Sequence, residues 1–309
     1  MAPVAHAAEP PRPRPRPPAP ATAPPATAPA TPAPPDPSAA RPAPVSVVVV
    51  AKDEEDRIEA CLRSAAWAAE RIVVVDETTR DRTAELARPL ATEVIVRPWE
   101  GFAGSKRFAI ARARHRWILW LDADERIDPD LAAACAAATA EPRGKAGFWM
   151  RRRSRYLGRE IRHGNWGSDS VLRLFDRERA RIDDRSVHEQ VRVDGPTARL
   201  RGILWHESYR DVAHHFEKIG EWSRLWAEQA RAEGRRTTAL DLLFRPPLRF
   251  VKGYLVRGGF RDGRTGLVVA VMDALYAGMK YTALLEAEKR GAREKKGIAS
   301  EGTESPEET

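Results

Sequence analysis

The sequence predicts an α/β fold in which a mostly parallel sheet carries helices on both faces and is followed by a helical extension. Two patterns predict it. Apolar runs rich in β-branched residues, which are typical of strands buried on both faces, recur from residue 45 onward. Between these runs, apolar residues repeat at helical spacing. Strands that alternate with helices favour crossover connections and therefore parallel strand pairs.

Four strands are expected in the first half of the domain, at residues 45–51, 71–75, 93–96 and 117–121. The first helix is expected from the spacing of Ile58, Cys61, Leu62, Ala65 and Ala69. A short second helix should begin at an Asp81 N-cap and stop at Pro89. A third helix is expected over residues 102–113. A fourth covers residues 129–140, with Asp128 as its N-cap and Pro129 in its first position.

The composition limits the class of protein. With 309 residues, of which 42% are hydrophobic, the chain can bury a sizeable core. Its two cysteines, Cys61 and Cys135, exclude a disulfide framework and a Cys-rich zinc module. No run of roughly 18 or more strongly apolar, uncharged residues is present, so the sequence predicts no conventional membrane-spanning helix.

The chain divides into four predicted segments. Residues 1–44 hold 17 of the 25 prolines and are predicted to be a disordered Pro/Ala-rich tail, because they offer too little apolar surface to offset the entropy of ordering. Residues 45–210 are expected to form the α/β domain, and residues 211–290 a helical extension suited to a membrane surface. Residues 291–309, with their acidic end, are predicted to be a second disordered tail.

Acidic clusters follow three of the predicted strands. They are Lys52-Asp53-Glu54, Asp76-Glu77-Thr78 and Asp122-Ala123-Asp124-Glu125. Because ligands of such sheets bind beyond the carboxyl ends of the strands, these residues should share one rim. Asp122 and Asp124 suit Mg²⁺ or Mn²⁺, which would neutralise a diphosphate. Glu54 and Asp76 suit hydrogen bonds to a base or a ribose hydroxyl. The alternative is a set of solvated acids before helices.

Three stretches carry a family resemblance: SVVVVAKDEEDRIEACLRS (residues 46–64), VVVDETTRDRT (73–83) and WILWLDADE (117–125). They resemble the family 2 glycosyltransferases, inverting enzymes with the GT-A nucleotide-sugar-binding fold. The resemblance covers about residues 45–215. It implies that Glu54 and Asp76 contact the nucleotide, while Asp122 and Asp124 serve the diphosphate and the metal.

A narrower likeness extends over GFAGSKRFAIARARHRWILWLDADE, HGNWGSDSVLRLFDR, SVHEQV and WHESY. These stretches resemble the bacterial lipopolysaccharide-core glycosyltransferases, which implies a lipid-linked glycan as the acceptor. Glu77-Thr78, Arg80 and Arg107 depart from the residues that are frequent in the family. The departures concern the nucleotide contacts and leave the expected fold unchanged.

Inverting transfer needs a base for the acceptor hydroxyl and cations for the leaving diphosphate. The resemblance implies an acidic residue after the last strands of the sheet, which makes Glu189 the first choice for the base and Asp169 the second. The alternative for Glu189 is an ordinary surface acid. Lys106 suits either a diphosphate contact or an exposed helix face. His206 suits either the metal shell or a structural hydrogen bond.

The residues that follow the α/β domain are strongly basic. Residues 245–264 contain six basic residues against Asp262 alone, interleaved with aromatic residues. This pattern suits an anionic membrane surface, and a packed hairpin with a solvated basic face is the alternative. Residues 266–285 are apolar but contain Asp273 and Lys280, so they should lie on a surface and not span the membrane. We expect a cytoplasmic protein, peripheral on the inner face of the cytoplasmic membrane.

Two other functions compete with glycosyl transfer. A nucleotidyltransferase shares the layered fold and the metal carboxylates, but usually has a glycine-rich basic loop after its first strand, where residues 52–56 are acidic. A nucleic-acid-binding protein would fit the net charge of +8, but no recognised binding module is visible. We therefore expect a glycosyltransferase that uses Mg²⁺ or Mn²⁺ and a nucleotide-diphosphate sugar donor, and no nucleic-acid partner.

Overall fold

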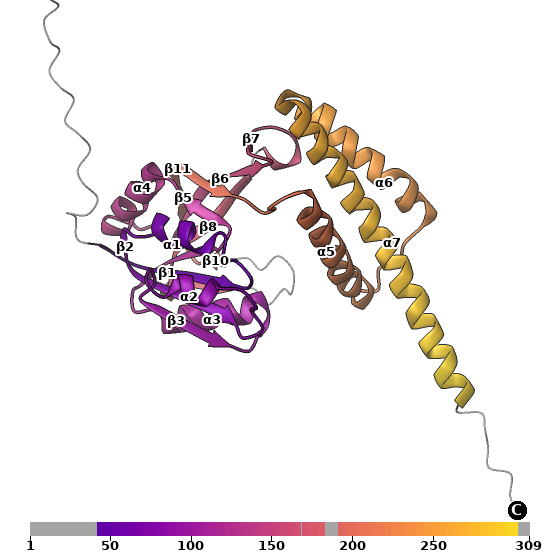
Figure 1. Cartoon of the computed structure of the whole chain (residues 1–309), viewed down its shortest axis with the longest axis horizontal. Helices are drawn as coiled ribbons and strands as arrows, with labels where there is room; N and C mark the ends of the chain where they lie inside the picture. Colours follow the sequence, from indigo (N-terminus) through magenta and orange to yellow (C-terminus); the bar gives the residue numbers. More distant parts are fainter. Residues whose placement is uncertain (1–41, 168, 183–190, 302–309) are drawn as a thin grey trace, which may run out of the picture. The chain divides into compact units, whose positions relative to one another are not determined.

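The computed structural model describes residues 42–167, 169–182 and 191–301 (Figure 1). The predicted tail over residues 1–44 lies outside the described residues except at its last three positions, where the first strand already begins. The base predicted at Glu189 also lies outside them, as do residues 302–309.

One mixed sheet of nine strands organises the part of the α/β domain that the structure describes. Along the sheet the order is β3-β2-β1-β4-β8-β6-β11-β5, with β7 paired to β6. These strands are β1 (Ala43–Ala51), β2 (Ala68–Asp76), β3 (Glu93–Arg97), β4 (Trp117–Asp122), β5 (Glu125–Ile127), β6 (Gly147–Tyr156), β7 (Arg159–Ile161), β8 (Asp169–Asp176) and β11 (Thr197–His206). A separate pair joins β9 (Ala180–Ile182) to β10 (Val191–Val193).

The α/β fold predicted from the sequence is confirmed, and the direction of its strands changes halfway across the sheet. Strands β3, β2, β1 and β4 are parallel, as the alternation of strands and helices predicts. Strand β8 is antiparallel to both β4 and β6. The reason is that no α-helix separates β6, β7 and β8, and strands joined without a long crossover pair antiparallel.

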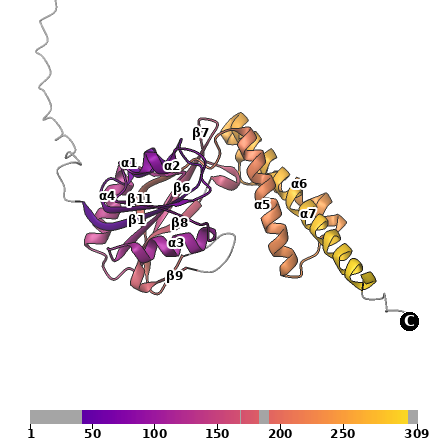
Figure 2. The ribbon, with the colours of Figure 1, turned by 60° about the horizontal axis from the view of Figure 1, so that its bottom comes forward.

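Helices cover both faces of the parallel half of the sheet. Helices α1 (Ile58–Ser64), α2 (Thr83–Ala87) and α4 (Pro129–Ala140) share one apolar core with Val47 and Val49 of β1. Helix α3 (Gly101–Arg112) packs on Val48 and Val50, which point to the opposite face. Figure 2 shows α1 and α4 on one side of the sheet and α3 on the other. The alternation of core membership along β1 follows from the two-residue period of a strand.

Two local expectations for the helices need correction. The first helix ends at Ser64, and Ala69 belongs to β2, because the chain turns after Ala65 to pair Ala43 with Ala68. Arg82, not Asp81, holds the N-cap position of α2, although Asp81 Oδ1 still accepts the backbone N–H of Thr83 at 2.9 Å. The Asp128 cap of α4 is confirmed by its bond from Leu131 N at 2.7 Å.

Three longer helices follow the sheet: α5 (Val212–Ala232), α6 (Ala239–Val251) and α7 (Gly263–Glu301). Helices α5 and α6 both pack along α7. Helix α6 continues through Pro246 and Pro247. Its surface is open, so carbonyl groups that lose an amide partner can be solvated. Helix α7 extends to Glu301, past residue 290 where the helical segment was expected to end.

The apolar part of α7 bears on the question of membrane contact. By length and composition, one stretch of the described chain, Gly259–Gly291, is able to cross a membrane. It contains Asp273 and Lys280, the two charges on which the expectation of a non-spanning helix depends. Asp273 is buried and bonded to Asn165 and Trp166 of the α/β domain. This contact holds α7 against the protein.

Candidate active site

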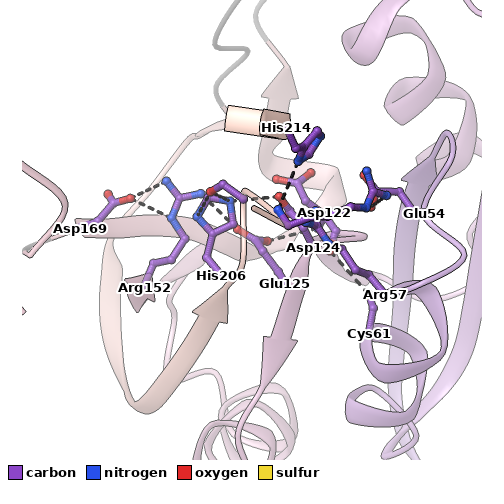
Figure 3. A network of polar contacts seen from close by, with 12 residues as sticks. Glu54, Arg57, Cys61, Asp122, Asp124, Glu125, Arg152, Asp169, His206 and His214 are labelled. Carbon is purple, nitrogen blue, oxygen red and sulfur yellow. Dashed lines mark hydrogen bonds and ion pairs between the residues drawn. The ribbon is translucent and has the colours of Figure 1, made fainter. Parts of the chain in front are cut away.

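The candidate site lies where the parallel strands β1, β2 and β4 end. Strand β1 is central, with Ala51 opposite Val75 of β2 and Val50 opposite Asp122 of β4, so the three carboxyl ends coincide. Figure 3 shows Glu54, Asp122 and Asp124 gathered at this rim together with His206. The rim therefore combines acidic side chains from two distant parts of the sequence with a histidine from a third.

Asp124 and His206 form the pair that is best arranged to hold a cation. Strand β11 runs antiparallel to β5 with His206 opposite Glu125, which brings the two loops together. His206 Nε2 lies 3.3 Å from Asp124 Oδ2. Burial alone would raise the pKa of Asp124, but the charge and hydrogen bond of His206, together with the charge of Arg57, lower that pKa. Asp124 is thus a carboxylate at neutral pH, next to a nitrogen ligand.

Asp122 lies beside this pair but is already surrounded by cations. Its Oδ1 accepts from Lys106 Nζ at 2.8 Å and from Trp120 Nε1 at 3.1 Å, and its Oδ2 accepts from Arg173. Burial opposes ionisation of Asp122, but Arg173 and Lys106 together hold its pKa well below the ordinary value. In this arrangement Asp122 fixes two cations at the rim.

Glu125 shares one of these cations, Arg173, and adds a third, Arg152. It is fully buried, and its Oε1 accepts from Arg173 at 2.7 Å and from Arg152 at 3.2 Å. Its Oε2 accepts the backbone N–H of Asp122 at 3.1 Å. The chain Lys106–Asp122–Arg173–Glu125–Arg152 therefore alternates in sign, and each charge has opposite charges beside it.

Lys106 is buried on helix α3. It is 5% exposed and its ammonium lies 3.9 Å from the centre of the Trp120 ring. Its neighbour Arg107 is exposed. The structure thus directs Lys106 toward Asp122 at the rim, and Lys106 is not part of an exposed helix face.

Glu54 is the rim carboxyl group whose pKa is raised. Burial raises its pKa to about 7, with the charge of Asp124 adding to the increase, while Arg57 and Arg210 oppose it. Arg57 Nη1 and Arg210 Nη2 each lie 3.5 Å from Glu54 Oε2. Near neutral pH this carboxyl group is able both to donate and to accept a hydrogen bond.

Asp76 differs from the other rim residues because it points inward. It is 2% exposed. Its Oδ1 accepts from the backbone and the hydroxyl of Thr78 at 2.9 Å, and Lys52 Nζ lies 3.0 Å from its Oδ2. A direct contact between Asp76 and a nucleotide would require Lys52 to move, whereas Lys52 itself faces solvent.

Of the two predicted bases, only Asp169 is among the described residues. It opens β8, and its Oδ2 accepts from Arg152 Nε at 2.8 Å. Figure 3 shows it beyond Arg152, on the side away from Glu54. Among the described residues, the contacts of Arg152, Glu125 and Arg173 join it to Asp122.

Three arginines that the sequence reasoning missed contribute to the site. Arg210 donates to Asp56 at 2.8 Å and to the carbonyl of Asp53 at 2.6 Å, and so fastens the segment after β11 to the loop after β1. Arg173 had a signal, because a single charge within the apolar run 171–175 indicates a buried, partnered cation. Arg152 lies within a run of three arginines. The sequence therefore does not indicate that the side chain of Arg152 points into the protein.

The described residues alone do not complete a metal site. Among them, no group of three or more His, Cys, Asp or Glu side chains is close enough to hold a metal ion. Asp124 and His206 supply one oxygen and one nitrogen ligand. Mg²⁺ is commonly held by one or two carboxylates together with waters and substrate phosphates. The pair therefore fits a divalent cation that arrives with a diphosphate.

Comparison with known proteins places the same region in one family. A family model described as glycosyl transferase family 2 matches residues 46–206. The lipopolysaccharide core biosynthesis glycosyltransferase LpsC of Rhizobium meliloti is 30% identical over 240 residues, which cover 75% of this chain and 88% of that protein. An uncharacterized glycosyltransferase of Rickettsia bellii is 37% identical over 262 residues, covering 78% of this chain and 86% of that protein.

Solved structures give a weaker likeness. The mannosyltransferase PcManGT from Pyrobaculum calidifontis, in complex with GDP-Man and Mn²⁺, matches 80% of this chain and 88% of its own, with a TM-score of 0.46 and 16% identity. Staphylococcus aureus TarS 1–349 in complex with UDP matches 80% of this chain and 91% of its own, with a TM-score of 0.39 and 13% identity.

Proposed function

This chain belongs to glycosyl transferase family 2, and from that premise we propose that it is a metal-dependent, inverting enzyme. It transfers a sugar from a nucleotide-diphosphate sugar to a lipid-linked glycan such as the lipopolysaccharide core. The observation that carries the proposal is the Asp124–His206 pair, 3.3 Å apart, beside Glu54 on the rim of the parallel strands. Family membership separates the chain from the nucleotidyltransferase and nucleic-acid-binding alternatives.

On the donor side, we assign the nucleotide to the loops after β1 and β2 and the diphosphate to the loop after β4. Glu54 hydrogen-bonds the nucleoside. Lys52, which is paired with Asp76 and exposed to solvent, also contacts the nucleoside. Asp124 and His206 hold Mg²⁺ or Mn²⁺, which when bound supplies positive charge to the diphosphate oxygens. Lys106, fixed by Asp122, faces the same oxygens with its ammonium.

Transfer then requires one proton movement. The acceptor hydroxyl oxygen bonds to the anomeric carbon of the donor sugar while the bond from that carbon to the diphosphate oxygen breaks, which inverts the configuration. The hydroxyl proton passes to a carboxylate, for which Glu189 remains the first choice and Asp169 the second. The nucleoside diphosphate leaves with both electrons of the broken bond, and cations at the rim balance its charge.

The acceptor side of the proposal includes an anionic membrane surface. Helix α6 presents a continuous apolar stripe whose residues are 41% to 65% exposed: Leu240, Leu243, Phe244, Leu248 and Val251. Arg245, Arg249 and Lys252 stand on the same helix or directly after it. An exposed apolar stripe flanked by basic residues suits the headgroup layer of anionic lipids. This supports peripheral binding on the inner face of the cytoplasmic membrane.

The experiment that tests the function is a thermal-shift screen of nucleoside diphosphates and their sugars, with and without Mn²⁺. We expect the melting temperature to rise with one class of nucleotide only when the metal is present. The sugar nucleotide of that class should then release its nucleoside diphosphate when a lipid-linked glycan is supplied. A protein that binds no nucleotide under any of these conditions would refute the proposed function.

A further inference from the structure

A pocket of about 170 Å³ opens where the α/β domain meets the three C-terminal helices. The rim site described above does not include it. Its walls combine aromatic rings with one acidic and one basic residue: Trp166, Tyr209, Trp222, Arg249, Asp273 and Tyr276. Each of α5, α6 and α7 contributes to it. Trp166, from the short 3-10 helix Gly164–Trp166, and Tyr209, from the segment after β11, belong to the α/β domain.

The volume of the pocket limits what fits. A cavity of about 150 Å³ is large enough for one benzene molecule. The pocket therefore takes one six-membered ring and is too small for a nucleotide. It is also not a dry cavity, because Trp222 is 38% exposed and the side chain of Arg249 is 43% exposed.

The aromatic residues form an ordered wall. The rings of Trp166 and Tyr209 stack at 5.6 Å with 30° between their planes, and Tyr209 stacks on His215 at 3.6 Å. Both rings are thereby fixed before any ligand arrives, which lowers the entropy lost on binding. Flat aromatic surfaces pack well against the carbon-bound hydrogens of a sugar ring.

The polar groups are arranged for hydroxyl groups and not for a charged ligand. Asp273 accepts from Asn165 Nδ2 at 2.6 Å and from Trp166 Nε1 at 3.3 Å, and Arg249 Nη2 lies 3.8 Å from its Oδ1. A carboxylate has about four acceptor positions, so it is able to accept from a ligand hydroxyl as well. The charges of Arg249 and Asp273 offset each other. Burial lowers the pKa of His215 to about 4, so this histidine is neutral at neutral pH.

Tyr209 connects the pocket to the rim site. It follows His206 closely in the chain, and its neighbour Arg210 binds the loop after β1. Burial raises the pKa of the Tyr209 phenol, and the charges of Asp273 and Asp124 are both close enough to raise it further. On the other side, Arg249 belongs to α6, which carries the exposed apolar stripe.

We propose that this pocket, between Trp166, Trp222 and Asp273, is an acceptor subsite that binds one uncharged sugar ring of the lipid-linked glycan. The inference rests on the proposed function and adds to it the chemical class of ligand and its place. A ring held here lies between the helix assigned to the membrane and the rim assigned to the donor. The subsite would thus select acceptors by a sugar unit at a distance from the reacting hydroxyl.

The test uses the full chain and a panel of neutral methyl glycosides, with binding followed by ligand-observed NMR. We expect at least one glycoside to bind the unmodified protein. Trp222→Ala should weaken that binding about tenfold or more, since it removes one wall of the pocket. Leu225→Ala is the matched control, because Leu225 is on the same helix, is also 38% exposed and is not part of the pocket. It should leave binding unchanged.

A second variant distinguishes a loss of glycoside binding from a loss of the folded structure. Asp273→Asn keeps the size of the side chain and should also weaken glycoside binding, with the melting temperature of each variant measured alongside. Asp124→Asn should bind the glycoside as the unmodified protein does. The pocket proposal is overturned if no neutral glycoside binds, or if Trp222→Ala and Asp273→Asn both bind normally. Metal-dependent nucleotide binding in the same samples separates this failure from a failure of the proposed function.

Discussion

His206 at the end of β11 lies with its Nε2 3.3 Å from Oδ2 of Asp124, in the loop after β4. The contact exists because β11 pairs antiparallel with β5, which sets His206 opposite Glu125. A further backbone bond, from Glu207 N to Asp124 O at 3.0 Å, holds the two loops in place. The pairing therefore brings a carboxylate and an imidazole together from two segments that are distant in the sequence.

Replacement of His206 tests whether the pair binds metal. His206→Gln should raise the Mn²⁺ concentration needed for nucleotide-induced stabilisation about tenfold or more, because one ligand of the cation is lost. The control is His214→Gln, since the His214 Nδ1 accepts from the backbone of Arg210 and does not contact Asp124 among the described interactions. Thermal shift at a fixed nucleotide concentration measures the effect. An unchanged Mn²⁺ requirement in His206→Gln would exclude a ligand role.

Glu54 makes the stability of the protein depend on pH. Its pKa is about 7 in the folded protein against an ordinary value of 4.5. The folded state therefore holds this proton more tightly than the unfolded state does, and stability from Glu54 is lost as the pH rises through about 7. Glu54→Gln should raise the free energy of unfolding by about 1–3 kcal/mol near pH 8 and by little near pH 4.

Urea unfolding at the two pH values measures this difference. Glu55→Gln is the control, because Glu55 lies in the same loop but is exposed. The free energy of unfolding of Glu55→Gln, relative to the unmodified protein, should not increase as the pH rises. If Glu54→Gln and Glu55→Gln behave alike, the buried environment inferred for Glu54 is wrong.

Arg173 should be necessary for stability because the fully buried carboxylate of Glu125 and the partly buried carboxylate of Asp122 both depend on it. Arg173→Met leaves Asp122 and Glu125 without their shared cation, and we expect it to lower the free energy of unfolding by about 3 kcal/mol at neutral pH. The additional change Glu125→Gln should recover part of the loss, since it removes one of the unpaired charges. Denaturant unfolding of the single and double variants tests this. A loss in Arg173→Met below roughly 0.5 kcal/mol would contradict the network.

The exposed stripe of α6 predicts binding to anionic lipid vesicles. Replacement of both Leu243 and Leu248 by Ser should weaken that binding about a hundredfold, because two leucine side chains no longer enter the headgroup layer. Raising the salt concentration should weaken binding of the unmodified protein as well. Val96→Ser, at an apolar site on β3 that is 50% exposed, is the control for surface polarity. Vesicle sedimentation gives the affinities, and equal binding by the double variant and Val96→Ser would rule out this surface.

The sequence predicted the parts of the fold that local patterns determine. The four parallel strands and the Asp128 cap are in place because apolar runs and capping residues act within a few positions. The antiparallel strands β6 and β8 were harder to find. Strand β6 contains Arg151, Arg152 and Arg153, which read as a solvated run until Glu125, Asp169 and Glu160 are brought beside them.

The same limit applies to the candidate site. Acidic residues at strand ends were recognisable one cluster at a time, and the common rim followed from the parallel order of β1, β2 and β4. The direction of each side chain was not predictable. Asp76 turns inward because Thr78 and Lys52 satisfy its carboxylate, and Arg210 reaches the first loop only through the tertiary fold.

The central claim is that Asp124 helps to hold a divalent cation against the diphosphate of the donor. Calorimetric titration of nucleoside diphosphates, with and without Mn²⁺, compares the unmodified protein with Asp124→Asn and with Asp130→Asn, an exposed acid on α4. We predict that Mn²⁺ strengthens nucleotide binding in the unmodified protein and in Asp130→Asn, and that Asp124→Asn loses this gain while remaining folded. Full metal-dependent affinity in Asp124→Asn would contradict the claim.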